Sequence, residues 1–233
     1  MNALVPAYKV VQRHFSAPPG KIGLLYGERS VYATGTLVAS EVIRRCGAVV
    51  FVDGANRVDP YYLARLARYR SLNPAEFLER AFVSRAFTCY QLDVAITDGL
   101  VEMLHAVNAA SLIVYGPMDL MDDDQAPLCD VYDIWARIRR TLEQLKSENI
   151  STLLVSKVPH FQIREREKLF PMLKTMSDVV YRLDSVGGYQ RITLEGGTNG
   201  TNGGNRNIPD TAGRTKLVKL PEGAQKRGSR FSR

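Results

Sequence analysis

The chain has 233 residues, of which 45% are hydrophobic and 24% charged, as in ordinary globular proteins that bury one full core. It contains no apolar run of membrane-spanning length, and its three cysteines form no C-x-x-C pair, which argues against a membrane protein, a disulfide framework and a zinc site. The net charge of +7 is uneven, because residues 196–233 carry eight Lys or Arg against two carboxylates, or +6. We therefore expect a cytoplasmic protein with a basic tail.

Short apolar runs rich in β-branched residues alternate with segments of helical spacing along the first 195 residues. An N-terminal segment, residues 1–20, closes with Pro18-Pro19-Gly20. The pattern then predicts strands at 22–26, 48–52, 81–86, 112–115, 152–155, 179–183 and 189–194, and helices at 37–46, 60–69, 75–80, 97–108, 130–148 and 165–175. This alternation predicts an α/β core domain over residues 21–195, with a twisted, mostly parallel central sheet flanked by helices.

The composition changes abruptly after Glu195. Residues 196–213 are rich in Gly, Asn and Thr and offer almost no apolar side chain to bury, so they are predicted to be a flexible linker. Residues 214–233 form a basic tail that we expect to be disordered unless bound. Its cations are candidates for contacts with DNA: Lys216, Lys219, Lys226, Arg227, Arg230 and Arg233.

The stretch from Gly23 to Thr34 has the layout of a phosphate-binding loop, a short apolar strand followed by a glycine and a helix start. A working loop reads G-x-x-x-x-G-K-[ST], in which the second glycine admits the phosphate and the lysine neutralises it. Counted from Gly27, through Glu28 and Arg29, Tyr32 stands at the second glycine and Ala33 at the lysine. Only Thr34 matches, so the loop is predicted to be degenerate.

Two further segments carry a family resemblance. Residues 59–67 read DPYYLARLA, and residues 72–87 read LNPAEFLERAFVSRAF. The second is similar to the L-N-P-x-x-h-L-x-x-h-x-h-x-R-A-h segment (h apolar) of RadA-type recombinases. With the order of strands and helices, residues 10–195 resemble the RecA/RadA recombinase superfamily. The resemblance implies a RecA-like P-loop NTPase core.

The catalytic groups that the resemblance implies are not matched. The position of the glutamate that activates water, two residues after Asp53, is Ala55. The strand that should end in a metal-binding aspartate runs instead through Tyr115 into Gly116-Pro117. With Ala33 at the lysine place, the groups for phosphate charge, metal and water are all absent, and phosphoryl transfer depends on them. We therefore expect no ATPase activity and no cofactor, with ATP and Mg²⁺ disfavoured.

The two loops that contact DNA in such recombinases correspond here to residues 118–130 and 156–164. The first contains five aspartates, which would repel a phosphate backbone and indicate either a solvated surface or a docking site for a basic partner. The second holds Lys157 and Arg164 beside an aromatic residue, which suits single-stranded DNA.

The first hypothesis is a non-catalytic RecA/RadA-like paralogue, an accessory or mediator subunit in DNA recombination or repair. It would bind an active recombinase or another subunit in an oligomer, and single-stranded DNA chiefly through its tail. The alternatives are an atypical RecA-like ATPase that uses groups around Thr34 and Arg29, and a KaiC-like regulatory scaffold that does not bind DNA.

Overall fold

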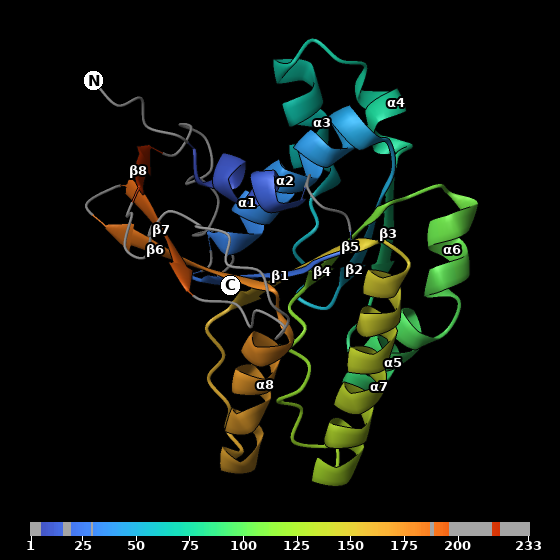
Figure 1. The fold of residues 1–233 in the computed structure, drawn as a ribbon, viewed down its shortest axis with the longest axis vertical. Helices are drawn as coiled ribbons and strands as arrows, with labels where there is room; N and C mark the ends of the chain where they lie inside the picture. Colours follow the sequence, from blue (N-terminus) through green and yellow to red (C-terminus); the bar gives the residue numbers. More distant parts are fainter. Residues whose placement is uncertain (1–5, 16–19, 29, 187–188, 196–215, 220–233) are drawn as a thin grey trace, which may run out of the picture.

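The computed structural model describes residues 6–15, 20–28, 30–186, 189–195 and 216–219. Within them a sheet of eight strands, in the order β3-β2-β4-β5-β1-β6-β7-β8, lies between two layers of helices (Figure 1). Its strands are β1 (Ile22–Gly27), β2 (Val49–Asp53), β3 (Ala81–Arg85), β4 (Ser111–Tyr115), β5 (Ser151–Lys157), β6 (Val179–Val186), β7 (Tyr189–Glu195) and β8 (Lys216–Lys219).

The six strands from β3 to β6 are mutually parallel, and only the last two pairings, β6 with β7 and β7 with β8, are antiparallel. The predicted α/β class with a mostly parallel sheet flanked by helices is thus confirmed. Strand β8 falls inside the tail for which disorder is predicted, so that expectation does not hold for residues 216–219. The predicted linker and the rest of the tail lie outside the described residues.

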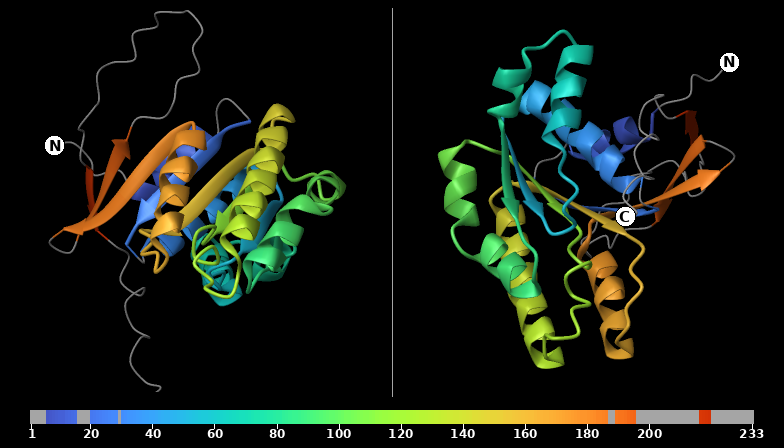
Figure 2. Two further views of the ribbon diagram at one scale, coloured as in Figure 1. Left: turned by 90° about the horizontal axis from the view of Figure 1, so that it is seen from below. Right: turned by 180° about the vertical axis from the view of Figure 1, so that it is seen from behind.

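The helices cover opposite faces of the sheet because the chain first adds strands toward one edge of the sheet and then toward the other edge. The steps from β1 to β2 to β3 run one way, and those from β3 through β4 and β5 to β6 run the other way. Right-handed crossovers then place the two sets of helices on opposite faces (Figure 2). One layer contains α1 (Ala7–Phe15), α2 (Val31–Cys46), α3 (Pro60–Tyr69) and α4 (Pro74–Leu78); the other contains α5 (Cys89–Thr97), α6 (Leu100–Ala106), α7 (Leu128–Ser147), the 3₁₀ helix η1 (Arg164–Lys168) and α8 (Leu169–Met176).

Each face of the sheet has its own hydrophobic core, and alternate strand residues enter one or the other. On β2, Val50 and Val52 pack under α5 and α7, whereas Phe51 packs under α2 and α3. Helix α7 presents the predicted stripe of Ile134, Ile138, Leu142 and Leu145, all buried. Strands covered on both faces are what continuous apolar runs predict.

Several helices differ from the prediction. Helix α1 lies within the N-terminal segment and packs against the core through Ala7 and Val11. Helix α2 begins at Val31, six residues earlier than predicted. The helix predicted at 97–108 is the shorter α6, which begins after Gly99 with its φ of 75°, and α5 (Cys89–Thr97) was not predicted.

None of the helices in the described part of the chain combines the length and the apolar character needed to cross a membrane.

Candidate functional site

The carboxyl ends of β1, β5 and β4 form the place where this fold would bind a ligand. The loop after β1 leads to α2 on one face, and the loop after the adjacent β5 leads to α8 on the other face. Open α/β sheets bind ligands in the crevice that such diverging loops leave at the carboxyl edge. The loop predicted to be a degenerate phosphate site lies at this crevice.

The backbone of that loop is bound to the protein itself. The amide of Glu28 donates to the carbonyl of Leu183 (3.3 Å), and the amide of Val31 donates to the carbonyl of Glu28 (3.0 Å). Gly27 has a φ of 152°, and a Cβ at this position would lie 2.0 Å from the Leu183 carbonyl oxygen. Phosphate-binding loops use free backbone amides as donors. At least two of the amides in this turn are already engaged. Arg29 lies outside the described residues.

Two buried tyrosines, Tyr32 and Tyr115, lie side by side at the carboxyl edge, and we call them the tyrosine plug. Tyr32 is 5% exposed, and its hydroxyl donates to Oδ2 of Asp119 at 3.0 Å. The two rings lie 5.4 Å apart, and the Tyr115 hydroxyl donates to the backbone carbonyl of Tyr32 (3.1 Å). Burial, followed by the nearby Asp119 carboxylate, raises the pKa of Tyr32, so it remains a neutral donor at physiological pH.

Helix α2 packs closely against the sheet beneath the tyrosine plug. A Cβ on Gly35 would lie 3.0 Å from the Tyr115 ring, so the glycine admits that ring. Thr36 lies one turn after Tyr32 and shares a hydrogen bond of 2.9 Å with the Tyr115 hydroxyl. Thr34 is 2% exposed, and its hydroxyl donates to the backbone carbonyl of Ser30 (3.3 Å) instead of facing the crevice. Ala33 is half-buried and supplies no charge to the crevice.

The ends of β2, β4 and β5 are held together by the backbone. The amide of Gly54 donates to the Tyr115 carbonyl, and that of Gly116 donates to the Val155 carbonyl, both at 2.8 Å. A Cβ on Gly116 would lie 2.7 Å from the Cβ of Ala55, so the position predicted for the missing glutamate is in close contact with the end of β4.

Asp53, the acidic residue at the end of β2, has a structural role. It is fully buried, and its carboxylate accepts the amides of Arg57 and Val58 at 2.8–3.0 Å. The carboxylate therefore closes the turn after β2.

The predicted acidic loop is fastened to the protein. The carboxylate of Asp122 accepts the amide of Gln162 (3.0 Å), and that of Asp130 accepts the Tyr90 hydroxyl (2.7 Å). Arg166, which is fully buried, donates to the backbone carbonyls of Met121, Asp123 and Ala126 at 2.6–2.9 Å. The sequence analysis did not single out Arg166, which is the main cationic anchor of this loop.

A cavity of about 210 Å³, the Asp119 pocket, opens beside the plug. It is lined by Met118, Asp119 and Asp122 after β4 and by residues 157–161 after β5. Lys157 lies at its rim, 55% exposed, with its Nζ 3.7 Å from Asp119. Arg164 is exposed at the start of η1. Thus one predicted DNA-binding cation of this loop is opposed by a carboxylate.

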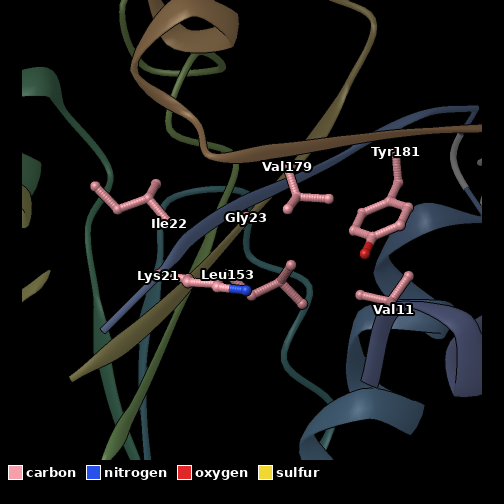
Figure 3. Close-up of a pocket in the computed structure, with 7 residues that line it drawn as sticks. All are labelled: Val11, Lys21, Ile22, Gly23, Leu153, Val179 and Tyr181. Atoms are coloured by element: carbon pink, nitrogen blue, oxygen red, sulfur yellow. The ribbon is translucent and has the colours of Figure 1, made fainter. Parts of the chain in front are cut away.

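Only some of the remaining candidate residues lie within the described part of the chain. Lys216 and Lys219 lie at the two ends of β8, while Lys226, Arg227, Arg230 and Arg233 lie outside the described residues. A second cavity, at the opposite end of β1, measures only about 10 Å³, which is the size of one water at most, and Figure 3 shows its mainly apolar lining. Across the described residues no group of three or more His, Cys, Asp or Glu side chains is arranged to hold a metal ion.

No family model matches the chain, and no curated protein matches it.

Proposed function

We propose that this chain is a non-catalytic RecA/RadA-like paralogue that acts as an accessory subunit in DNA recombination or repair by binding a catalytically active recombinase or a similar subunit. The tyrosine plug carries the proposal, because Tyr32, at the position of the second glycine, is buried and bonds Asp119 across the carboxyl edge. The family assignment rests on the resemblance of residues 59–67 and 72–87, and the α/β fold with this loop at its carboxyl edge agrees with it.

The partner-binding site that we propose lies on β3, α5 and the start of α7, and we call it the α5 surface. Its large apolar side chains are more than a third exposed: Phe87 (63%), Tyr90 (45%), Val94 (55%) and Leu128 (38%). Among the described residues β3 pairs only with β2, so its other edge is open. A strand edge beside exposed aromatic side chains is a common site for another chain to add a strand.

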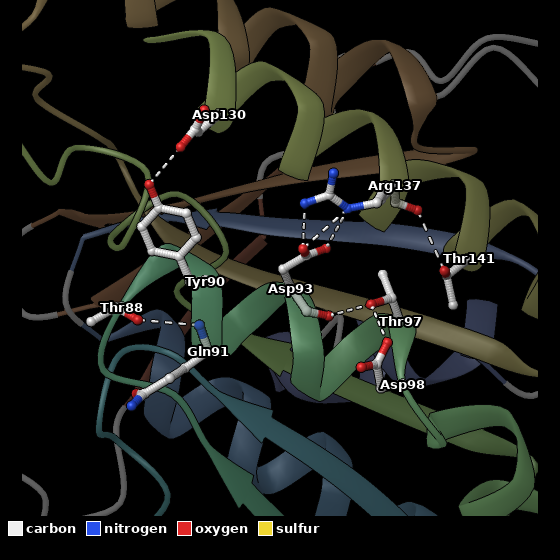
Figure 4. Close-up of polar contacts among 9 residues, drawn as sticks. All are labelled: Thr88, Tyr90, Gln91, Asp93, Thr97, Asp98, Asp130, Arg137 and Thr141. Carbon is white, nitrogen blue, oxygen red and sulfur yellow. Dashed lines mark hydrogen bonds and ion pairs between the residues drawn. The ribbon is translucent and has the colours of Figure 1, made fainter. Parts of the chain in front are cut away.

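Polar contacts keep the α5 surface rigid (Figure 4). Arg137 of α7 donates to the carboxylate of Asp93 on α5, with its shortest contact at 2.5 Å, and the Tyr90 hydroxyl donates to Asp130. At the start of α5 the side chain of Thr88 accepts the amide of Gln91 at 3.1 Å and caps the helix. A preorganised apolar surface loses little entropy on binding, which favours protein association.

The test is recovery of partners from a native extract with the tagged full chain and with the double variant Phe87→Asp plus Val94→Asp. A matched control is Tyr61→Asp, since Tyr61 is 87% exposed on α3, away from the α5 surface. We expect the double variant to lose a recombinase-type partner that the wild type and the control retain. Equal recovery by all three proteins would refute the α5 surface, and recovery of no nucleic-acid-processing protein would refute the recombination assignment.

The two alternatives are separable from this proposal. An atypical ATPase would bind ATP in the plugged crevice, which calorimetry with ATP and Mg²⁺ detects. A KaiC-like scaffold would show no salt-dependent DNA binding. For that measurement Lys226, Arg227, Arg230 and Arg233 should be changed to Gln in the full chain, because a version ending at Glu195 would also remove β8.

A further inference from the structure

Helix α3 presents a face of aromatic and cationic side chains to the solvent, which we call the α3 face. Its members are Tyr61, Arg65, Arg68 and Tyr69, all exposed. They follow the i, i+4, i+7 and i+8 spacing that places residues on one side of a helix. Tyr61 is 87% exposed and Tyr69 is 89% exposed, so neither ring packs in the core. Both rings are therefore accessible to a ligand.

The positive charge of the α3 face is not paired. Among the residues that the structure describes, neither Arg65 nor Arg68 forms an ion pair with a carboxylate. The guanidinium carbon of Arg65 lies 5.0 Å from the centroid of the Tyr62 ring, a cation–π contact that orients the side chain and leaves its charge in place. The face thus presents two cations and no carboxylate.

More positive charge adjoins the end of α3. Arg70 donates to the carboxylate of Glu41 on α2, and Arg44 and Arg45 approach the same carboxylate at 2.9 and 3.8 Å. Because three guanidinium groups share one carboxylate, this cluster keeps a net positive charge. Residues 57–70 carry four Arg against one Asp, whereas residues 1–195 carry 23 Lys or Arg against 22 Asp or Glu. Positive charge is therefore denser around α3 than over residues 1–195 as a whole.

Both ends of α3 are fixed, so its exposed face is preorganised. At the start, the carboxylate of Asp59 accepts the amides of Tyr61 and Tyr62 at 2.9 and 3.2 Å and caps the helix. At the end, Arg70 donates to the hydroxyl of Ser40 on α2 at 2.8 Å. A rigid surface loses little entropy when a ligand binds.

Single-stranded nucleic acid is the ligand that matches both the rings and the charges. Unpaired bases stack on aromatic side chains, and cations beside those side chains contact the phosphates. Bases inside a duplex are stacked on one another and cannot reach exposed rings in this way. The next helix, α4, carries two exposed carboxylates, Glu76 and Glu79, so charge alone does not select the ligand and the two tyrosines are needed.

The spacing of the tyrosines suits a short stretch of one strand. Tyr61 and Tyr69 are eight residues apart, which is about 12 Å along the helix at about 1.5 Å per residue. Phosphates of one stacked strand follow one another at about 3.4 Å, so the α3 face spans about three of them. Arg65 and Arg68 lie between the two tyrosines, where those phosphates would pass.

We propose that the α3 face is a binding site for single-stranded nucleic acid, with Tyr61 and Tyr69 as stacking platforms and Arg65 and Arg68 as phosphate contacts. Helix α3 lies in the helix layer opposite the one that contains α5 (Figure 1), so a protein partner on the α5 surface leaves this site open. The site does not depend on the α5 surface or on the family resemblance.

The first experiment measures binding of the full chain to a short fluorescent oligothymidylate by anisotropy. Tyr61→Leu plus Tyr69→Leu removes both rings and keeps every charge. Stacking of one base on an aromatic side chain contributes about 1–3 kcal/mol, so affinity should fall about tenfold for each tyrosine. The salt dependence of binding should stay the same. Because both side chains are exposed, the thermal midpoint should also stay the same.

The second experiment tests the arginines by the salt dependence of binding. Each phosphate contact to a single strand contributes about 0.7 to the slope of log affinity against log salt, so Arg65→Gln plus Arg68→Gln should lower that slope by about 1.4. The matched charge control is Arg139→Gln plus Arg140→Gln, two exposed arginines of α7. The control should keep both the affinity and the slope of the wild type.

The cations of the tail are separated from this site by repeating the comparison with Lys226, Arg227, Arg230 and Arg233 changed to Gln. Residual binding that still requires the tyrosines supports the α3 face. Loss of all binding in that background, or affinity unaffected by the tyrosine changes, would overturn the proposal. Equal competition by duplex DNA, or tyrosine-dependent binding to vesicles of phosphatidylserine without binding to oligothymidylate, would also overturn it.

The outcome is distinguishable from that for the α5 surface. Partner recovery through the α5 surface is measured in nuclease-treated extract, where Tyr61→Asp remains a control because no nucleic acid bridges the proteins. The double variant Phe87→Asp plus Val94→Asp should lose the protein partner and keep oligothymidylate binding. Loss of both activities in that variant would show that the two surfaces are not independent and would overturn a separate α3 site.

Discussion

The contact between Tyr32 and Asp119 should be measurable as a coupling free energy. We propose a double-mutant cycle with Tyr32→Phe, Asp119→Ala and the combined variant. Tyr32→Phe keeps the ring against Tyr115 and removes only the hydroxyl that donates to Asp119 at 3.0 Å. A hydrogen bond to a charged group contributes about 1.5–3 kcal/mol. Because the Asp119 side chain is 15% exposed, we expect the lower part of this range, a coupling of about 1.5 kcal/mol.

The assay is equilibrium urea unfolding followed by tryptophan fluorescence. The chain has one tryptophan, Trp135, which is 1% exposed in the core and should report unfolding cleanly. Thr36→Ser provides a control for the plug, since it keeps the hydroxyl that contacts Tyr115. A coupling below about 0.5 kcal/mol, which is within the usual additivity of independent sites, would refute the reasoning that this hydrogen bond closes the crevice.

Three further outcomes are expected. Arg166→Met removes the donor to three backbone carbonyls and should destabilise the chain by about 2–4 kcal/mol, read as a lower thermal midpoint; an unchanged midpoint would show that the acidic loop does not need this anchor. Burial raises the pKa of Tyr115, Tyr181 and Tyr32, so above about pH 10 the unfolded state loses protons that the folded state keeps. Below that pH these groups should not change the free energy of unfolding. Above it the free energy of unfolding should fall by up to about 1.4 kcal/mol per pH unit for each tyrosine. Urea titrations of Tyr181→Phe should show a shallower fall than those of the wild type. Finally, Tyr32→Gly plus Ala33→Lys should not create a calorimetrically detectable ATP site, because the amides of this turn are engaged; micromolar binding would contradict this.

The sheet could be predicted from the sequence because its strands are buried on both faces. Runs such as residues 49–52 are continuously apolar and end in turn residues, a pattern with few alternative structures. The helix starts at Asp59-Pro60 and Asn73-Pro74 were also predictable, since the side chains of Asp59 and Asn73 accept the first amides of α3 and α4.

Helix α5 was not predictable from periodicity because apolar residues surround it. Cys89, Leu92 and Ile96 face the core, while Tyr90 and Val94 face outward. The outward residues obscure the amphipathic pattern on which helix prediction relies, and they are the same residues that form the α5 surface. The exposed apolar residues that we propose bind a partner thus obscure the helix in the sequence.

The early start of α2 has a different cause. Residues 31–36 include Thr34, Gly35 and Thr36, which are weak helix formers, and the phosphate-loop template places them partly outside the helix. Tertiary contacts outweigh that propensity, because the Tyr115 ring packs against Gly35 and its hydroxyl bonds Thr36. The loop alignment predicted which residues differ from a phosphate-binding loop, but it did not predict that Tyr32 is buried and bonds Asp119.

The tyrosine plug and the Asp119 pocket share one carboxylate, that of Asp119. Oδ2 of Asp119 faces the Tyr32 hydroxyl, a neutral donor that closes the crevice without cancelling the negative charge. Lys157, at 3.7 Å and largely exposed, screens that charge only weakly. Asp119 also lines the pocket with Asp122, so the pocket borders two carboxylates. Had a lysine occupied the position of Ala33, as in a nucleotide site, its ammonium group would have been available to neutralise charge at this edge. A lysine at position 33 would therefore change the electrostatics of the same edge at which Asp119 accepts the Tyr32 hydroxyl.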